Sequence, residues 1–365
     1  MAEDAALLEK RAELKRQLVA GEYRTLIDVI LDGTGRLIQK LTRSPKPPPF
    51  WYNAVVIVLA TLVISFLTSI LLGEPYPLIR RDWILGEVAF VGLFFACVIA
   101  HKEVYIGILF SSLRDKLLDA IESVTDLVDL QGWLAAVCDV KKPLLLSLPF
   151  SFLFTFYGLI FISTIRGGFV GFGPTTSSII VNFQGGMLLY YLLLFLNLPI
   201  RLSRYQFKLY AADPSSSEVI DCLSDMLNNF VYIVAVLAAI LTLIFAFFRL
   251  LTVDGIILLM LVGWGPITIF FVINQYALTK IIANAKWKTL NGIQTKIEKL
   301  AAEENIADKE KMEAVNRLMD YHDRIKATRN SALDLRAGLN FLNSLLLPLL
   351  AFVLGNLDKI LAYFS

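Results

Sequence analysis

Long apolar blocks alternate along this chain with polar, helix-forming segments. Six blocks are long enough to cross a bilayer, which takes about 20 apolar residues in an α-helix. They cover residues 53–73, 85–101, 143–165, 184–203, 230–249 and 255–274. A seventh block, 339–354, is short and contains Pro348, so it is a short span, a re-entrant segment or an interfacial helix. The pattern predicts an all-α fold, a polytopic α-helical membrane protein with six or seven membrane helices.

The polar segments also carry apolar stripes at three- or four-residue steps, which mark amphipathic helices. One stripe predicts a single helix over 103–130, with Ile106, Leu109, Leu113, Leu117, Ile121, Val124 and Val128 on one face. Two more stripes lie on either side of a break at 305–308. They consist of Leu290, Ile293, Ile297 and Leu300, then Val315, Leu318, His322 and Ile325. They predict an antiparallel helical hairpin, with a spacing that also suits a coiled coil within or between subunits.

Lysine and arginine set the orientation, because they are enriched in the short cytoplasmic flanks of membrane helices. They gather at 36–46, 102–142, 204–229 and after the sixth block, which all lie on one side if six spans alternate. Arg80 and Arg81 are exceptions in a short loop of the other side. The majority predicts an integral protein of the plasma (inner) membrane with a cytoplasmic N-terminus.

Four regions follow from this reading. Residues 1–50 form cytoplasmic N-terminal amphipathic helices and a proline-rich linker, and 51–275 form the transmembrane domain with the inner helical segments 102–142 and 204–229. Residues 276–338 form the cytoplasmic hairpin, and 339–365 form a C-terminal hydrophobic segment that is membrane-spanning, re-entrant or interfacial.

Composition narrows the classes of function. The chain is 56% hydrophobic and 18% charged, and its net charge of +2 gives no reason to expect a nucleic-acid partner. The three scattered cysteines predict neither a disulfide framework nor a zinc site. No P-loop, GxSxG, HExxH or dinucleotide motif is present. We therefore expect no enzyme activity, no cofactor and no metal.

Glycines and prolines supply most of the candidate pore or gate residues. Residues 170–173 resemble the potassium-channel filter, although Phe169 replaces its usual threonine and no pore helix precedes it. Gly171 and Gly173 are candidates on this ground, and a flexible outer loop is the alternative. Gly263, Gly265 and Pro266 break the sixth block, which indicates either a gating bend or a packing kink.

Charged candidates are few. Glu87 is the one carboxylate well inside a predicted span, where it is an ion ligand or a residue at the interface or bundle interior. Four basic residues form a candidate cytoplasmic rim, and the alternatives are lipid headgroup contacts and a solvated helix face. They are Arg324, Lys326, Arg329 and Arg336.

Polar-poor spans, kinking prolines and a striped hairpin favour a homo-oligomeric channel for ions or small solutes. Its cytoplasmic helices would form an assembly or gating collar, and the lipid bilayer would be its surroundings. A secondary transporter or permease is the alternative from the same class. The third hypothesis is a non-transporting scaffold that binds a cytoplasmic protein partner.

Overall fold

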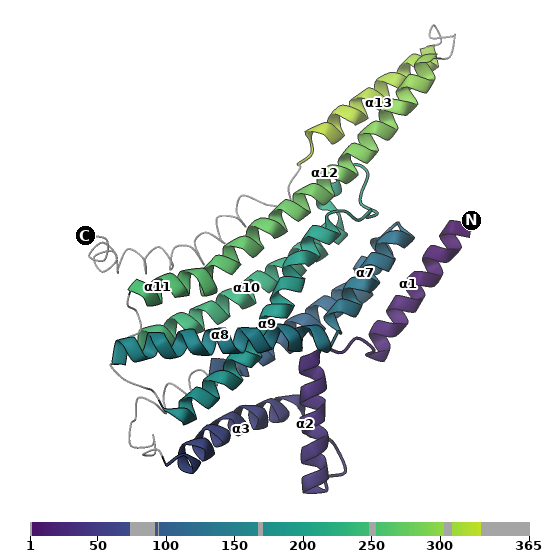
Figure 1. Ribbon diagram of the computed structural model, residues 1–365. Helices are drawn as coiled ribbons and strands as arrows, with labels where there is room; N and C mark the ends of the chain where they lie inside the picture. The colour runs from purple at the N-terminus through teal and green to yellow at the C-terminus, as the bar shows by residue number, and fades with distance from the viewer. Residues whose placement is uncertain are drawn as a thin grey trace, which may run out of the picture.

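The computed structural model describes residues 2–73, 92–93, 95–166, 171–247, 253–302 and 309–329 (Figure 1). Every regular element in these ranges is a helix, and the one strand-like pairing there is an isolated bridge between Ile121 and Phe207. The all-α prediction is therefore confirmed for the described residues. Five helices in these ranges are long and apolar enough to cross a membrane, namely Phe50–Leu71, Lys141–Ile160, Thr175–Leu202, Glu218–Phe245 and Gly265–Leu300.

The longer helices are α1 (Ala2–Ala20), α2 (Leu26–Thr42), α3 (Phe50–Leu71), α7 (Val124–Val137), α8 (Lys141–Arg166), α9 (Phe172–Leu202), α10 (Glu218–Phe247), α12 (Gly265–Ala302) and α13 (Lys309–Ala327). The shorter elements are η2 (His101–Leu109), α5 (Phe110–Ser112), η3 (Leu113–Leu117), α6 (Leu118–Ala120), η4 (Pro214–Ser216), α11 (Val253–Leu259) and η5 (Met260–Trp264). The predicted span 85–101 is described only at 92–93 and 95–101, which are helical, and the block 339–354 lies wholly outside the described residues.

The helix predicted over 103–130 is interrupted. Its first part runs through η2, α5, η3 and α6, and the chain then becomes extended at Ile121 before α7 begins. The break follows from backbone pairing, because the N–H of Glu122 donates to the carbonyl of Gln206 and the N–H of Lys208 donates to that of Ala120. Val128 consequently leaves the predicted stripe and is exposed.

Helix boundaries elsewhere also differ from the predicted ones. The stretch between the predicted spans 143–165 and 184–203 is already helical from Phe172, so α9 is longer than the predicted span. Apart from the single turn η4, the predicted inner segment 204–229 is irregular up to Ser217, and its remainder is the first part of α10. The predicted sixth span, 255–274, begins in α11 and η5, and its remainder forms one continuous helix, α12 from Gly265 to Ala302, with the first helix of the predicted hairpin.

The main core joins α7, α9 and α10. The ring of Trp133 meets that of Phe195 edge-on at 5.4 Å between centroids, and Phe195 meets Phe230 at 4.9 Å. The indole N–H of Trp133 donates to the carbonyl of Leu194 over 3.1 Å, so the buried ring has its polar atom satisfied. The first part of the interrupted stripe, from Leu109 to Ile121, is buried in the same core.

A helical arm projects from this body (Figure 1). The 38 residues of α12 give a length of about 57 Å, which exceeds the ~30 Å hydrocarbon core of a bilayer. Helix α13 packs back along the far part of α12, where Leu290, Ile293 and Ile325 are buried together. The ammonium of Lys286 donates to the carbonyls of Lys326 and Thr328, each over 2.8 Å, and so caps the end of α13.

Candidate functional site: a polar seam between α3 and α9

Helix α3 has its polar side chains inside and its apolar side chains outside. Apart from Ala54, its buried residues are Asn53, Thr61, Ser65 and Ser69. Its large apolar side chains are instead exposed, among them Leu59, Val63, Ile64, Leu67, Ile70 and Leu71. Lipid tails solvate leucine and valine well, so membrane helices put small and polar residues in their contacts with one another. This inverted pattern supports a membrane location for α3.

The face of α9 that meets α3 is equally small and polar. A Cβ atom at Gly173 would lie 1.9 Å from Oγ of Ser69 and 2.8 Å from the carbonyl oxygen of Ser65, so only glycine fits there. Ser177 and Gln184 are also buried, and they lie 4 and 11 residues further along α9. At 3.6 residues per turn, these spacings keep both near the face of Gly173. We call Thr61, Ser65, Ser69, Gly173, Ser177 and Gln184 the polar seam.

Polar atoms in and beside the seam lack hydrogen-bond partners among the described residues. They are Oγ of Ser69, Oε1 of Gln184 and, toward the start of α3, Oδ1 of Asn53. A buried polar atom without a partner costs about 1–3 kcal/mol. Thr61, by contrast, donates to the carbonyl of Ile57 within its own helix. The seam therefore has free hydrogen-bonding capacity that water or a polar solute can use.

The contact between α8 and α9 provides a comparison. Ser151 donates to the carbonyl of Ile179 over 2.7 Å, and the amide of Asn182 donates to Thr155 over 3.0 Å. At Gly186 a Cβ atom would lie only 2.6 Å from Cα of Ser147. The polar groups named here are paired across or within the helices, so this second contact is explained by packing alone.

The residues that sequence reasoning placed in a pore or gate lie in several places. Gly171 is the N-cap of α9 with φ 106°, a left-handed conformation that favours glycine, and Gly173 is part of the polar seam. Glu87 and the stretch 167–170 lie outside the described residues. Of the four residues that resemble the potassium-channel filter, three are described: Gly171, Phe172 and Gly173. They form the N-terminus of α9.

Gly263, Gly265 and Pro266 lie at a π-helical turn, η5, that leads into α12. A Cβ atom at Gly263 would be 3.7 Å from Cβ of Ala238, and the indole of Trp264 donates to Thr242 over 3.3 Å. Both partners belong to α10. The break is therefore packed against a neighbouring helix, and π turns of this kind often mark functional positions in membrane and soluble helices.

The predicted basic rim is described in part. Arg324 and Lys326 are exposed in the last turn of α13, and Arg329 is exposed just after it. Arg336 lies outside the described residues. The carbonyl of Lys326 accepts the hydrogen bond from Lys286, so this end of α13 is fixed to α12.

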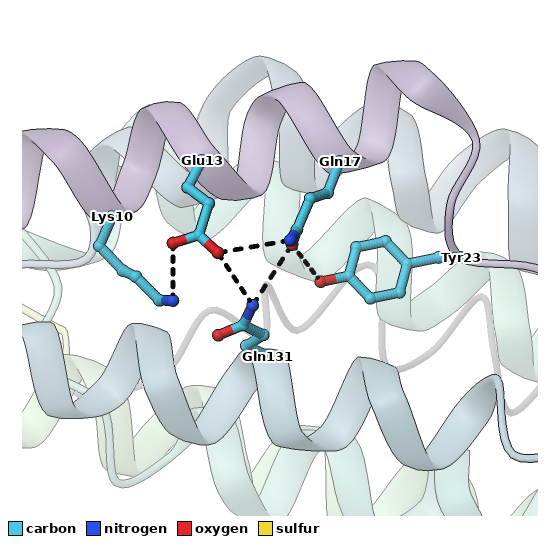
Figure 2. A network of polar contacts seen from close by, with 5 residues as sticks. All are labelled: Lys10, Glu13, Gln17, Tyr23 and Gln131. Carbon is cyan, nitrogen blue, oxygen red and sulfur yellow. Dashed lines mark hydrogen bonds and ion pairs between the residues drawn. The ribbon is translucent and has the colours of Figure 1, made fainter.

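A polar network fixes α1 to α7 (Figure 2). The carboxylate of Glu13 accepts from Lys10 over 2.8 Å, from Gln17 over 3.3 Å and from Gln131 over 3.5 Å. Gln17 in turn accepts from Tyr23 and from Gln131. The hydrogen bond from Lys10 is the main reason that the pKa of Glu13 is lowered.

Sequence reasoning missed the polar seam and two further polar clusters, the network around Glu13 and the pairs made by Asp129. Thr61, Ser65 and Ser69 recur every four residues, and that spacing was a usable signal in an otherwise apolar block. In one cluster, Asp129 accepts from Arg201 and Tyr205, and burial raises the pKa of Tyr205. Nothing in the sequence shows this pairing, because α7 lies more than 70 residues from its partners.

No family model, curated protein or solved structure matches this chain.

Proposed function

We propose that this chain is the subunit of a homo-oligomeric membrane channel for ions or small polar solutes, and that the polar seam is part of its conducting path. The observation that carries the proposal is the set of unpartnered polar atoms on Ser69, Gln184 and Asn53, at the buried faces of membrane-length helices. Unsatisfied polar groups are expensive in a bilayer, and they persist where they contact water or a permeant species.

The chemistry of the path is neutral. The polar seam presents hydroxyl and amide groups, and none of its six residues is charged. Such groups can replace part of an ion's hydration shell or hydrogen-bond to a small uncharged solute. From Asn53 to Ser69, the buried polar positions follow α3 for about 24 Å, most of the hydrocarbon thickness.

In this proposal the described conformation is closed. The contact between Ser69 and Gly173 leaves no room even for a methyl group, so the two helices must separate there before anything passes. The π turn at Gly263, Gly265 and Pro266 acts as a hinge rather than as a pore wall, because its small residues pack on α10. The helical arm of α12 and α13 forms the assembly or gating collar.

Flux through reconstituted liposomes tests the proposal. Ions and small neutral solutes should cross vesicles that hold the parent protein, and Ser65→Leu should abolish the flux by filling the polar seam. Val63→Leu is the matched control, because Val63 lies two residues away on the exposed face. Thr61→Val removes a hydroxyl at constant size and should lower the flux even if Ser65→Leu does not fold.

Absence of flux for every ion and solute with the parent protein would overturn the channel. Parent-like flux in Ser65→Leu and Thr61→Val would place the path elsewhere. A saturable, counterflow-competent flux would favour the transporter alternative.

One observation favours a scaffold as the second candidate. Met312, Met319 and Tyr321 are exposed on α13, and flexible methionine side chains adapt to varied protein surfaces. Two results together would support this role. The parent protein would show no flux, and Met312→Glu and Met319→Glu would release a bound cytoplasmic partner.

A further inference from the structure

Helix α2 consists of two halves with different surroundings. Its first half is held inside the body, where Leu26, Ile27 and Leu31 are buried. A reciprocal capping box between Thr25 and Asp28 begins the helix. The hydroxyl of Thr25 lies 2.9 Å from Nε2 of buried His101, and the N–H of Leu26 donates to the hydroxyl of Tyr191 over 2.8 Å. This end of α2 is therefore fixed.

The second half of α2, taken here with its C-cap Arg43 as residues 36–43, leaves the body and is amphipathic. Leu37 is 59% exposed and Leu41 is 76% exposed, and their four-residue spacing puts them on one face. Arg36, Lys40 and Arg43 are exposed on the flank and the opposite side of the helix. An uncovered leucine pair bordered by cations is the pattern of a helix that lies in a membrane interface.

The contact between α2 and α3 indicates that residues 36–43 are covered by the membrane interface. A Cβ atom at Gly35 would lie 2.6 Å from Nδ2 of Asn53, so α2 crosses α3 tightly at the first turn of the membrane helix. Trp51 and Tyr52 are exposed at that same turn, where aromatic residues anchor a helix at the headgroup level. Residues 36–43 therefore start at the depth of the membrane interface.

The direction of α2 agrees with this depth. In Figure 1, α2 runs across the direction of α3, α8 and α10 rather than along it. A helix that crosses the spans at their inner end lies along the membrane plane.

We infer that residues 36–43 form an anionic-lipid binding surface, with Leu37 and Leu41 inserted at the boundary between headgroups and acyl chains. Arg36, Lys40 and Arg43 contact the phosphate groups of acidic phospholipids. This role is independent of whether the polar seam conducts.

Insertion is tested by fluorescent labelling of the full chain in nanodiscs of phosphatidylcholine and phosphatidylglycerol. An environment-sensitive probe is placed at Leu41→Cys or, as the control, at Asp32→Cys, after Cys97, Cys138 and Cys222 are replaced. Asp32 is exposed on the cationic side of the same helix. The probe at 41 should be quenched by lipids with a spin label near the headgroup, and the probe at 32 by aqueous iodide. Equal iodide quenching at both sites would overturn insertion. A probe at 41 that neither quencher reaches would also overturn it, because a second copy of the chain would then cover the site.

Lipid charge is tested by counting co-purified phosphatidylglycerol on the intact protein by native mass spectrometry. Each of Arg36→Gln, Lys40→Gln and Arg43→Gln should weaken binding of the acidic lipid roughly fivefold. Lys296→Gln, on the exposed surface of α12 in the helical arm, is the matched control and should leave lipid binding unchanged. Unchanged phosphatidylglycerol binding in the triple variant would overturn the assignment, provided that its thermal stability equals that of the parent.

Discussion

Gly173 has to be glycine because Ser69 and the backbone of Ser65 fill the space where a side chain would stand. The same logic explains why the buried face of α3 is made of serine, threonine and asparagine. In lipid, large apolar side chains gain little from turning inward, whereas small ones allow close approach of two backbones. The apolar blocks could be predicted from the sequence, but the residues that each block buries against a neighbouring helix could not. A one-dimensional pattern shows that Ser65 and Ser69 are small and polar without showing which helix they meet.

Gly173→Ala should destabilise the protein by about 1–3 kcal/mol, because its methyl group would overlap Ser69 and the carbonyl of Ser65. A thermal-shift measurement in detergent checks this. Gly158→Ala is the control, since a Cβ atom there meets open space. Ser69→Gly should restore part of the loss in the double variant. Equal melting temperatures for the parent and Gly173→Ala would contradict the tight contact.

At the scale of elements, the sequence predicted helices well and their interruptions poorly. The stripe of 103–130 correctly marks Leu109, Leu113 and Leu117 as buried. The stop at Ile121 is imposed by pairing with the distant segment 206–208, which no local propensity encodes. The continuity of α12 was missed for the opposite reason, because polarity changes near residue 275 while the helix does not end. The composition of a segment indicates whether lipid or water surrounds it, and does not indicate where its helix ends.

Lys286→Met should loosen α13 from α12. The ammonium of Lys286 is buried and satisfies two C-terminal carbonyls of α13, which the thioether cannot do, at a cost of about 1–3 kcal/mol. Hydrogen exchange of the α13 amides should accelerate. Lys288→Met is the control, because the ion pair of Lys288 with Glu122 is exposed and is worth about 0–1 kcal/mol. Identical α13 protection in the parent and Lys286→Met would show that the cap does not hold the arm.

Acid should weaken the docking of α1. The pKa of Glu13 is lowered in the folded protein, mainly by its hydrogen bond from Lys10. A carboxyl of this kind stabilises the docked state fully above its ordinary pKa of 4.5, and the contribution is lost as the pH falls through the lowered value. The effect is small because Glu13 is solvated. Energy transfer between probes on Glu9→Cys and Val128→Cys should fall in that acidic range. Glu13→Gln should flatten this pH response, and an unchanged response in Glu13→Gln would exclude Glu13 as its cause.

At the scale of the whole molecule, the alternation of apolar blocks predicts that the polar segments between successive pairs of spans gather at one end. The start of α3, the start of α8, the end of α9 and the start of α10 lie toward one end of the body, with α1 and α7 (Figure 1). The helical arm extends from that end as well. Lys141, Lys142, Arg201 and Arg204 belong to it, as the positive-inside rule requires of a cytoplasmic face. The polar seam could not be predicted at this scale, since it depends on which two of the spans touch.

We therefore expect α1 and the helical arm to be cytoplasmic and the end of α3 to face outward. Single cysteines at Glu9, Gln294 and Leu72, in a background without the three native cysteines, report the three locations, and all three positions are exposed. A membrane-impermeant maleimide added to intact cells should modify position 72 and should reach 9 and 294 only after permeabilisation. Labelling of 9 and 294 alone from outside would reverse the orientation. Labelling of 9 without 294, or of 294 without 9, would contradict the shared end that the structure gives α1 and the arm.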